Sequence, residues 1–100
     1  MAKPLERDFQ KVVLKDLKQI PKLYCHKAMA GSIRGIPDIV GCVNGMFFGL
    51  ELKRSRSSRV DKLQLYTGMQ ISRAGGLSLV AYPENWDKIL DIIKLYSGEK

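Results

Sequence analysis

Apolar residues recur along the chain at two different spacings, and these spacings predict the order of helices and strands. A period of three to four residues is typical of an amphipathic helix, and short apolar runs bounded by turn residues are typical of strands. Helices are expected at residues 5–20, 59–74 and 84–96. Strands are expected at residues 23–29, 37–43, 46–53 and 77–82. The order α-β-β-β-α-β-α predicts an α/β fold with a mixed sheet flanked by helices.

Several local signals set the ends of these elements. The apolar stripe of the first helix consists of Leu5, Phe9, Val12, Val13, Leu17 and Ile20. Pro21 follows as a helix breaker. Ser58 and Asp61 have the spacing of a capping box, which predicts that the second helix starts near Arg59. Its predicted inner stripe is Val60, Thr67, Ile71 and Ala74, with Gln64 among them.

The dipeptide Asn44-Gly45 fixes the pairing of the second and third strands. Asn-Gly between two apolar runs predicts a type I′ hairpin turn, because both residues tolerate positive φ. A two-residue turn pairs Val43 with Met46, and the same register places Asp38 opposite Glu51. Lys53 lies two residues after Glu51 and therefore on the same face. Two acids and a lysine are thus expected to converge within apolar strands.

Like charges directly opposite each other in a sheet are destabilising, so this pair of acids needs compensation. Oxygen ligands at this spacing suit Mg²⁺ or Mn²⁺, and Asp38 with Glu51 is therefore a candidate metal site. Lys53 would neutralise remaining charge or position a water molecule. The alternative is that both acids lie at strand ends, solvated and paired with lysines. On the first helix, Glu6 and Asp16 both lie at or within the apolar stripe, and position alone does not separate them.

The composition of the chain indicates the charge of its binding partner. The 100 residues, 45% of them hydrophobic, suit a single domain over residues 1–100. Lys and Arg number 17 against 10 for Asp and Glu, and the net charge of +7 indicates a polyanion, either nucleic acid or an anionic membrane surface. No apolar run is long enough to span a bilayer, and the N-terminal residues do not resemble a signal peptide. We therefore expect a cytoplasmic protein with Cys25 and Cys42 as reduced thiols.

These residues together resemble a known family. Pro37-Asp38 followed by Glu51-Leu52-Lys53 looks like the motif of PD-(D/E)XK nucleases, and the wider pattern is similar to their VRR-NUC branch. The elements that carry the resemblance are Glu6, Arg34 to Asp38, Glu51 to Lys53, Gln64 and Gly75 or Gly76. The resemblance spans most of the chain and implies a restriction-endonuclease-like α-β-β-β-α-β core followed by a C-terminal helix.

What the resemblance implies is metal-dependent hydrolysis of phosphodiester bonds in DNA. Asp38, Glu51 and the main-chain carbonyl of Leu52 would hold Mg²⁺ or Mn²⁺, and Lys53 would orient or activate water. Glu6 and Gln64 would support the metal and the substrate. The basic residues expected to hold the DNA backbone are Arg34, Arg54, Arg56 and Arg59.

Small stand-alone members of the family, of the phage type, resemble Holliday-junction resolvases, so branched DNA is the expected substrate. The same resemblance implies that the cytoplasm is that of a bacterium or a phage-infected host. The alternatives are a nicking, flap-type or restriction-like nuclease, or a basic nucleic-acid-binding module without catalysis. A homodimer is also expected, because resolving a four-way junction needs two symmetric cuts. The last helix agrees, since its apolar residues cover an arc of about 160°, wider than the roughly 100° stripe of a surface helix. That arc consists of Trp86, Ile89, Leu90, Ile92, Ile93 and Tyr96, with Leu95 outside it.

Overall fold

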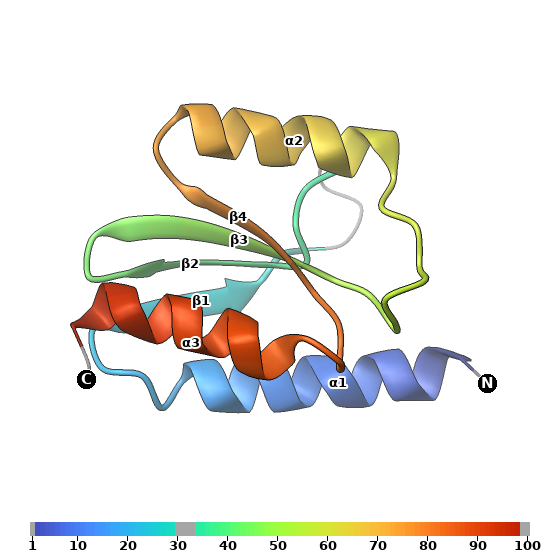
Figure 1. Cartoon of the computed structure of the whole chain (residues 1–100), viewed down its shortest axis with the longest axis horizontal. Coiled ribbons are helices and arrows are strands. Elements are labelled where there is room, and N and C mark those ends of the chain that lie inside the picture. The colour runs from blue at the N-terminus through green and yellow to red at the C-terminus, as the bar shows by residue number, and fades with distance from the viewer. Residues whose placement is uncertain (1, 30–33, 99–100) are drawn as a thin grey trace.

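Four strands form one mixed sheet, as the sequence predicts, and their order in the sheet is β1-β2-β3-β4 (Figure 1). The computed structural model describes residues 2–29 and 34–98, with side chains from residue 7 onward. The elements are α1 (Ala2–Leu17), β1 (Leu23–Lys27), β2 (Ile39–Val43), β3 (Met46–Leu52), α2 (Lys62–Arg73), β4 (Leu77–Ala81) and α3 (Trp86–Ser97). Strand β2 is antiparallel to both β1 and β3, and β4 runs parallel to β3.

The β2–β3 hairpin has the predicted turn and register. Asn44 and Gly45 have φ angles of 49° and 88°, which are the positive values that a type I′ turn requires. Val43 pairs with Met46, and the ladder continues in the same register to Ile39 and Leu50. Asp38 lies one residue before β2, next to this last pair, and its carbonyl accepts a hydrogen bond of 2.9 Å from Ala28 N. The hairpin thus brings Asp38 to the level of Glu51.

The two faces of the sheet are covered very differently (Figure 1). Helices α1 and α3 lie together on one face and enclose the core, whose largest fully buried side chains include Phe48, Leu17 and Ile39. Helix α2 lies alone on the other face, over β3 and β4. Side chains alternate along β3, so Phe48 and Leu50 enter the core while Glu51 points to the α2 face.

Several predicted boundaries were wrong by a few residues. Helix α1 ends at Leu17, and Ile20 is buried from the following turn. Val12 is exposed, although the helical stripe includes it. Helix α2 starts at Lys62 with Asp61 as its N-cap, because the capping box joins Asp61 to Gln64 and not Ser58 to Asp61. The N-cap is therefore Asp61, which lies closer than Ser58 to the first apolar residue of the helix.

The inner stripe predicted for α2 was right only in part. Gln64, Thr67 and Ile71 are half-buried, whereas Ala74 is exposed and Val60 precedes the helix. The contact between helix and sheet uses small residues: a Cβ built on Gly68 would collide with Ser78, and one on Gly49 would lie 3.1 Å from Ile71 Cδ1. Helix α2 therefore approaches the sheet through small and polar groups and the half-buried Ile71, and none of its side chains is fully buried.

Within the described residues, no helix is long and apolar enough to cross a membrane. Cys25 is buried and Cys42 is exposed, and neither forms a disulfide.

The tight packing at Gly41 gives a test of this sheet. A Cβ at Gly41 would lie 2.7 Å from Phe48 Cζ and 2.9 Å from Cys25 Cβ, inside the core face of β2. We expect Gly41→Ala to lower the unfolding free energy by about 1–3 kcal/mol or more, the usual cost of overpacking a core. Thermal denaturation measures the effect. Cys42→Ala, on the opposite face of the same strand, is the control, and equal melting temperatures for the two variants would contradict this packing.

Candidate active site

The predicted acids and lysine lie together at one end of the sheet. Glu51 is the penultimate residue of β3, Lys53 directly follows that strand, and Asp38 directly precedes β2. Glu51 is buried, and Asp38 and Lys53 are half-buried. Gln64, in the first turn of α2, extends its side chain to Glu51 from the helix that covers this face of the sheet. Four predicted residues from three separate segments are therefore brought together.

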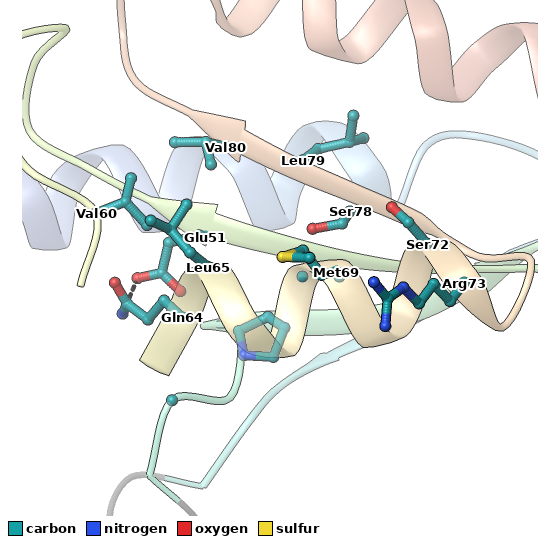
Figure 2. Close-up of a pocket in the computed structure, with 14 residues that line it drawn as sticks. Glu51, Val60, Gln64, Leu65, Met69, Ser72, Arg73, Ser78, Leu79 and Val80 are labelled. Atoms are coloured by element: carbon teal, nitrogen blue, oxygen red, sulfur yellow. Dashed lines mark hydrogen bonds between the residues drawn. The ribbon is translucent and has the colours of Figure 1, made fainter. Parts of the chain in front are cut away.

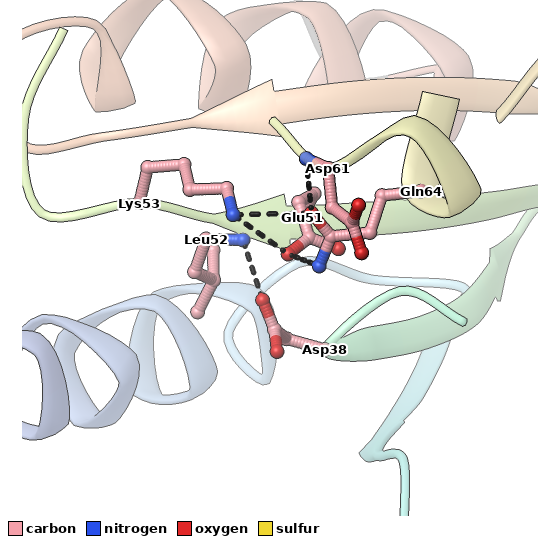
Figure 3. A network of polar contacts seen from close by, with 6 residues as sticks. All are labelled: Asp38, Glu51, Leu52, Lys53, Asp61 and Gln64. Atoms are coloured by element: carbon pink, nitrogen blue, oxygen red, sulfur yellow. Dashed lines mark hydrogen bonds and ion pairs between the residues drawn. The ribbon is translucent and has the colours of Figure 1, made fainter. Parts of the chain in front are cut away.

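A polar network joins these residues (Figure 3). Lys53 Nζ lies 3.5 Å from Glu51 Oε2 and donates a hydrogen bond of 3.1 Å to Gln64 Oε1. The Gln64 side-chain amide donates in turn to Glu51 Oε2. Gln64 Oε1 also accepts a bond of 3.1 Å from the backbone N–H of Asp61. One glutamine therefore caps α2 and holds both the acid and the lysine of the E-x-K segment.

Asp38 is oriented by the backbone of the neighbouring strand. Its Oδ2 accepts a hydrogen bond of 2.7 Å from the backbone N–H of Leu52 (Figure 3). This bond turns the Asp38 carboxylate toward the end of β3, beside Glu51. The sequence register predicted the approach of the two acids but not this backbone contact.

Glu51 carries an unsatisfied buried atom. Its Oε1 is buried and has no hydrogen-bond partner among the described residues. Burial, followed by the negative charge of Asp38, raises the pKa of Glu51 from 4.5 to about 8, although Lys53 acts in the opposite direction. Without a further positive charge, the site therefore favours a protonated Glu51 at neutral pH. Buried acids that are left this way are unusual outside functional sites.

Oxygen atoms are what this site could offer to a metal ion. Asp38 and Glu51 supply carboxylates, and the free Oε1 of Glu51 is the atom that a cation would satisfy. No group of three or more His, Cys, Asp or Glu side chains is close enough to hold a metal in the described part of the chain. Within the described residues, further ligands would be main-chain carbonyls, with water or substrate oxygens completing the site as is usual for Mg²⁺. Glu6, which was predicted to support the metal and the substrate, belongs to α1, but its side chain lies outside the described residues.

The other acid in the apolar stripe of α1, Asp16, has a structural partner. Asp16 Oδ2 accepts a hydrogen bond of 2.8 Å from the indole Nε1 of Trp86 in α3. This bond ties the two helices of the core side together, and it explains a polar residue within the α1 stripe. The sequence left Asp16 and Glu6 as alternatives, and the structure assigns Asp16 to packing.

The arginines predicted to hold DNA are all exposed around this end of the sheet. Arg54, Arg56 and Arg59 lie on the loop that connects Lys53 to the start of α2. Arg34 lines a cavity of about 340 Å³ together with Lys27 and Asp38. Positive side chains therefore occur beside Asp38 and on the loop that follows Lys53.

A second opening reaches Glu51 from beneath α2 (Figure 2). This cleft of about 450 Å³ runs between α2 and strands β3 and β4. Glu51 and Gln64 lie at one end, and Ser72, Arg73 and Ser78 lie at the other. Its walls include Pro37, Val60, Leu65, Met69 and Val80. The sequence did not predict this cleft, because it depends on how far α2 stands from the sheet.

The fold has a solved counterpart. A solved structure described as a "VRR_NUC domain" matches with a TM-score of 0.74 and 19% sequence identity, covering 87% of this chain and 95% of that one. No family model and no curated protein matches the sequence. At this identity the likeness concerns the fold, and it confirms the restriction-endonuclease-like α/β architecture that the motif resemblance implied.

The raised pKa of Glu51 predicts how stability depends on pH. The unfolded chain loses the Glu51 proton near pH 4.5 and the metal-free folded protein near pH 8, so stability falls as the pH rises between these values. Glu51→Gln cannot ionise and should remove this contribution. In EDTA, we expect the melting temperature of the variant, relative to that of the wild type, to rise as the pH increases from 5 to 8. Each kcal/mol corresponds to roughly 4–8 °C in a domain of this size.

Glu84→Gln, an exposed acid before α3, serves as the control for this measurement. It should show no such gain. A difference between Glu51→Gln and wild type that stays constant from pH 5 to pH 8 would show that Glu51 titrates normally.

Proposed function

We propose that this protein is a metal-dependent endodeoxyribonuclease of the VRR-NUC branch of PD-(D/E)XK nucleases. The observation that carries the proposal is the buried Glu51 beside Asp38, with one oxygen unpaired and the pKa raised to about 8. A divalent cation would resolve both the repulsion and the missing contact. The five matching motif elements and the shared fold support the assignment.

The donor set fits Mg²⁺ or Mn²⁺, because both acids offer hard oxygen ligands. Asp38 and Glu51 would hold the cation, with the Leu52 carbonyl as a third ligand and Glu6 in support. When bound, the cation lowers the pKa of a water molecule at the site and stabilises negative charge developing on the phosphate. The Leu52 N–H fixes the Asp38 carboxylate for this purpose.

Lys53 and Gln64 would act on the water and the substrate. The Lys53 ammonium group is held 3.5 Å from Glu51 Oε2 and 3.1 Å from Gln64 Oε1. These two contacts restrict the conformations that the Lys53 side chain can adopt. Its remaining N–H groups can donate to an attacking water or to a phosphate oxygen. Gln64 fixes both Lys53 and Glu51, and we infer that it positions them and does not itself take part in proton transfer.

The substrate is proposed to be branched DNA, such as a Holliday junction. Arg34, Arg54, Arg56 and Arg59 are exposed, and we propose that they bind phosphates without reading bases. The preference for a branched substrate follows from the resemblance to junction resolvases. Two symmetric cuts would require two copies of the single candidate site, so we also propose a homodimer.

A basic binding module without catalysis explains the observations less well. Positive charge alone would account for the arginines and the net charge of +7. It gives no reason to bury Glu51 beside Asp38 and to hold it with Lys53 and Gln64. Binding without cleavage would be the outcome if the acids were only structural.

The decisive variants are Asp38→Asn, Glu51→Gln and Lys53→Ala. Each should lower cleavage of a labelled four-way junction in Mg²⁺ by more than about 100-fold, because even outer partners of metal ligands typically contribute 10- to 100-fold. Single-turnover assays with and without EDTA measure the loss. Asp91→Asn, an exposed acid on α3, should cleave normally. Full activity of Asp38→Asn, or activity of the wild type in EDTA, would contradict the site.

The basic loop should dominate the salt dependence of binding. Replacing Arg54, Arg56 and Arg59 with alanine should make the slope of log K against log salt shallower, by up to about 0.9 for each phosphate that the protein no longer neutralises. Fluorescence anisotropy in Ca²⁺ measures the slope. Replacing Lys15, Lys88 and Lys94, which are exposed on α1 and α3, removes the same charge from the opposite face. Equal effects of the two triple variants would place the DNA elsewhere.

A further inference from the structure

The sheet face that carries the acids continues beyond helix α2 as an exposed surface. Helix α2 contacts β3 and β4, whereas the part of this face formed by β1, β2 and the start of β3 reaches solvent. Tyr24 and Phe47 are 65% and 45% exposed there, and His26 and Cys42 are exposed as well. Three aromatic rings therefore lie on the open face of antiparallel strands, opposite the core.

The strand register arranges these residues in rows. Tyr24 pairs with Cys42, and Cys42 pairs with Phe47, so one row crosses three strands. His26 lies in the next row, and its ring centroid is 5.6 Å from that of Tyr24. Rows on one face are two residues apart along a strand, or about 7 Å. Asp38 belongs to the row after His26, because it precedes the partner of His26 by two positions. The rings therefore lead along the sheet to the acids.

Exposed rings on an antiparallel sheet are the surface on which several folds bind single-stranded nucleic acid. In those folds, unpaired bases stack on Phe, Tyr or His side chains of the strands. Single exposed apolar residues are common on protein surfaces and need no explanation. Tyr24, His26 and Phe47 differ, because adjacent rows place them on one continuous surface, which we call the aromatic platform.

The aromatic platform ends at a cavity beside α2. Phe47 lines this cavity of about 410 Å³ together with Thr67, Gln70 and Ile71 of the helix. Its lining combines an aromatic ring and an aliphatic side chain with a side-chain amide, which offers both a donor and an acceptor. An apolar wall for the face of a base and polar groups for its edge are what the binding of an unpaired base requires.

Charge around the aromatic platform favours a polyanion over a protein partner. Residues 17–37 include Lys18, Lys22, Lys27 and Arg34 and no acid. Lys22 directly precedes β1 and Lys27 ends it, and both are exposed. Lysine is depleted in protein–protein interfaces, whereas sites for single-stranded nucleic acid combine rings with cations. Lys27 and Arg34 also line the cavity beside Asp38, so positive charge continues from the rings to the acids.

We propose that the aromatic platform binds the unpaired bases of a single-stranded DNA segment by stacking. Bases lie on Tyr24, His26 and Phe47, while Lys22 and Lys27 hold the phosphates. The contact tolerates any sequence, because every base has a π face. Delivery of a single-stranded arm to the acids is a use that rests on the proposed function, but the stacking itself does not.

Binding of a fluorescein-labelled oligothymidylate in EDTA tests the aromatic platform. Tyr24→Leu and Phe47→Leu should each weaken this binding at least about fivefold, because each removes the stacking of a base. Tyr24→Phe keeps the ring and should bind as the wild type does. Binding of a duplex of equal length should change less than about twofold, since its bases are paired and the phosphate contacts remain. Fluorescence anisotropy measures each Kd, and circular dichroism checks that the variants are folded.

Unchanged oligothymidylate affinity of both leucine variants, or an equal loss of duplex binding, would overturn the proposal. The control is Tyr96→Leu, on α3 at the opposite face of the sheet, where the tyrosine is 39% exposed. It should leave binding unchanged. Sedimentation detects the competing outcome, since leucine variants that alter the mass of the protein but not its DNA affinity would assign the rings to a protein contact and overturn the proposal.

Salt dependence separates the rings from the lysines. Lys27→Ala should make the slope of log K against log salt shallower by up to about 0.7, the value for one phosphate of a single strand. Tyr24→Leu should leave the slope as it is, because a stacked base carries no charge. A slope that falls equally in both variants would show that Tyr24 acts only through the phosphates, against the proposal.

Photocrosslinking locates the bases without a substitution in the protein. An oligothymidylate that carries 5-iododeoxyuridine should crosslink to Tyr24, His26 or Phe47, as read by mass spectrometry of the peptides. Crosslinks confined to the loop of residues 54–59 would contradict the aromatic platform. None of these measurements uses cleavage. Stacking by an inactive protein would overturn the nuclease alone, and an active nuclease that binds oligothymidylate without Tyr24 and Phe47 would overturn the platform alone.

Discussion

The structure depends on one electrostatic constraint, the burial of the Glu51 carboxylate beside Asp38. Burial and the second acid raise the pKa of Glu51 to about 8, and only one of its oxygens has a partner. The hairpin register, the Leu52 N–H, Lys53 and Gln64 all converge on this pair. A protein that needed only stability would gain by replacing such a pair with apolar side chains. The arrangement is consistent with a site that is completed by a cation.

The two faces of the sheet have different roles, one in the core and the other in the candidate site. Its α1–α3 face holds the buried core, fastened by contacts such as the Asp16–Trp86 hydrogen bond. Its α2 face holds the acids, and α2 rests there on small and polar groups without a buried side chain. The helix that supplies Gln64 is therefore anchored without any buried side chain of its own.

The sequence predicted the parts of this site that follow from local rules. Asn44-Gly45 permits one hairpin register, and from it the shared face of Asp38, Glu51 and Lys53 follows by alternation. Longer-range features could not be predicted. The side of α2 that meets the sheet was predicted only in part, through Gln64, Thr67 and Ile71. Its close contact with the sheet, such as that of Gly68 with Ser78, depends on tertiary packing. The choice of Asp61 over Ser58 as a cap, and the Leu52 contact with Asp38, likewise depend on tertiary packing.

The most direct measurement of this account is an NMR titration of the Glu51 side-chain carboxyl group, with and without Mg²⁺. In EDTA its apparent pKa should lie near 8, and saturating Mg²⁺ should move it well below that value, because a bound cation favours the ionised carboxylate. A midpoint near 4.5 in EDTA, or one that Mg²⁺ leaves unchanged, would contradict the claim that Glu51 and Asp38 form a metal site.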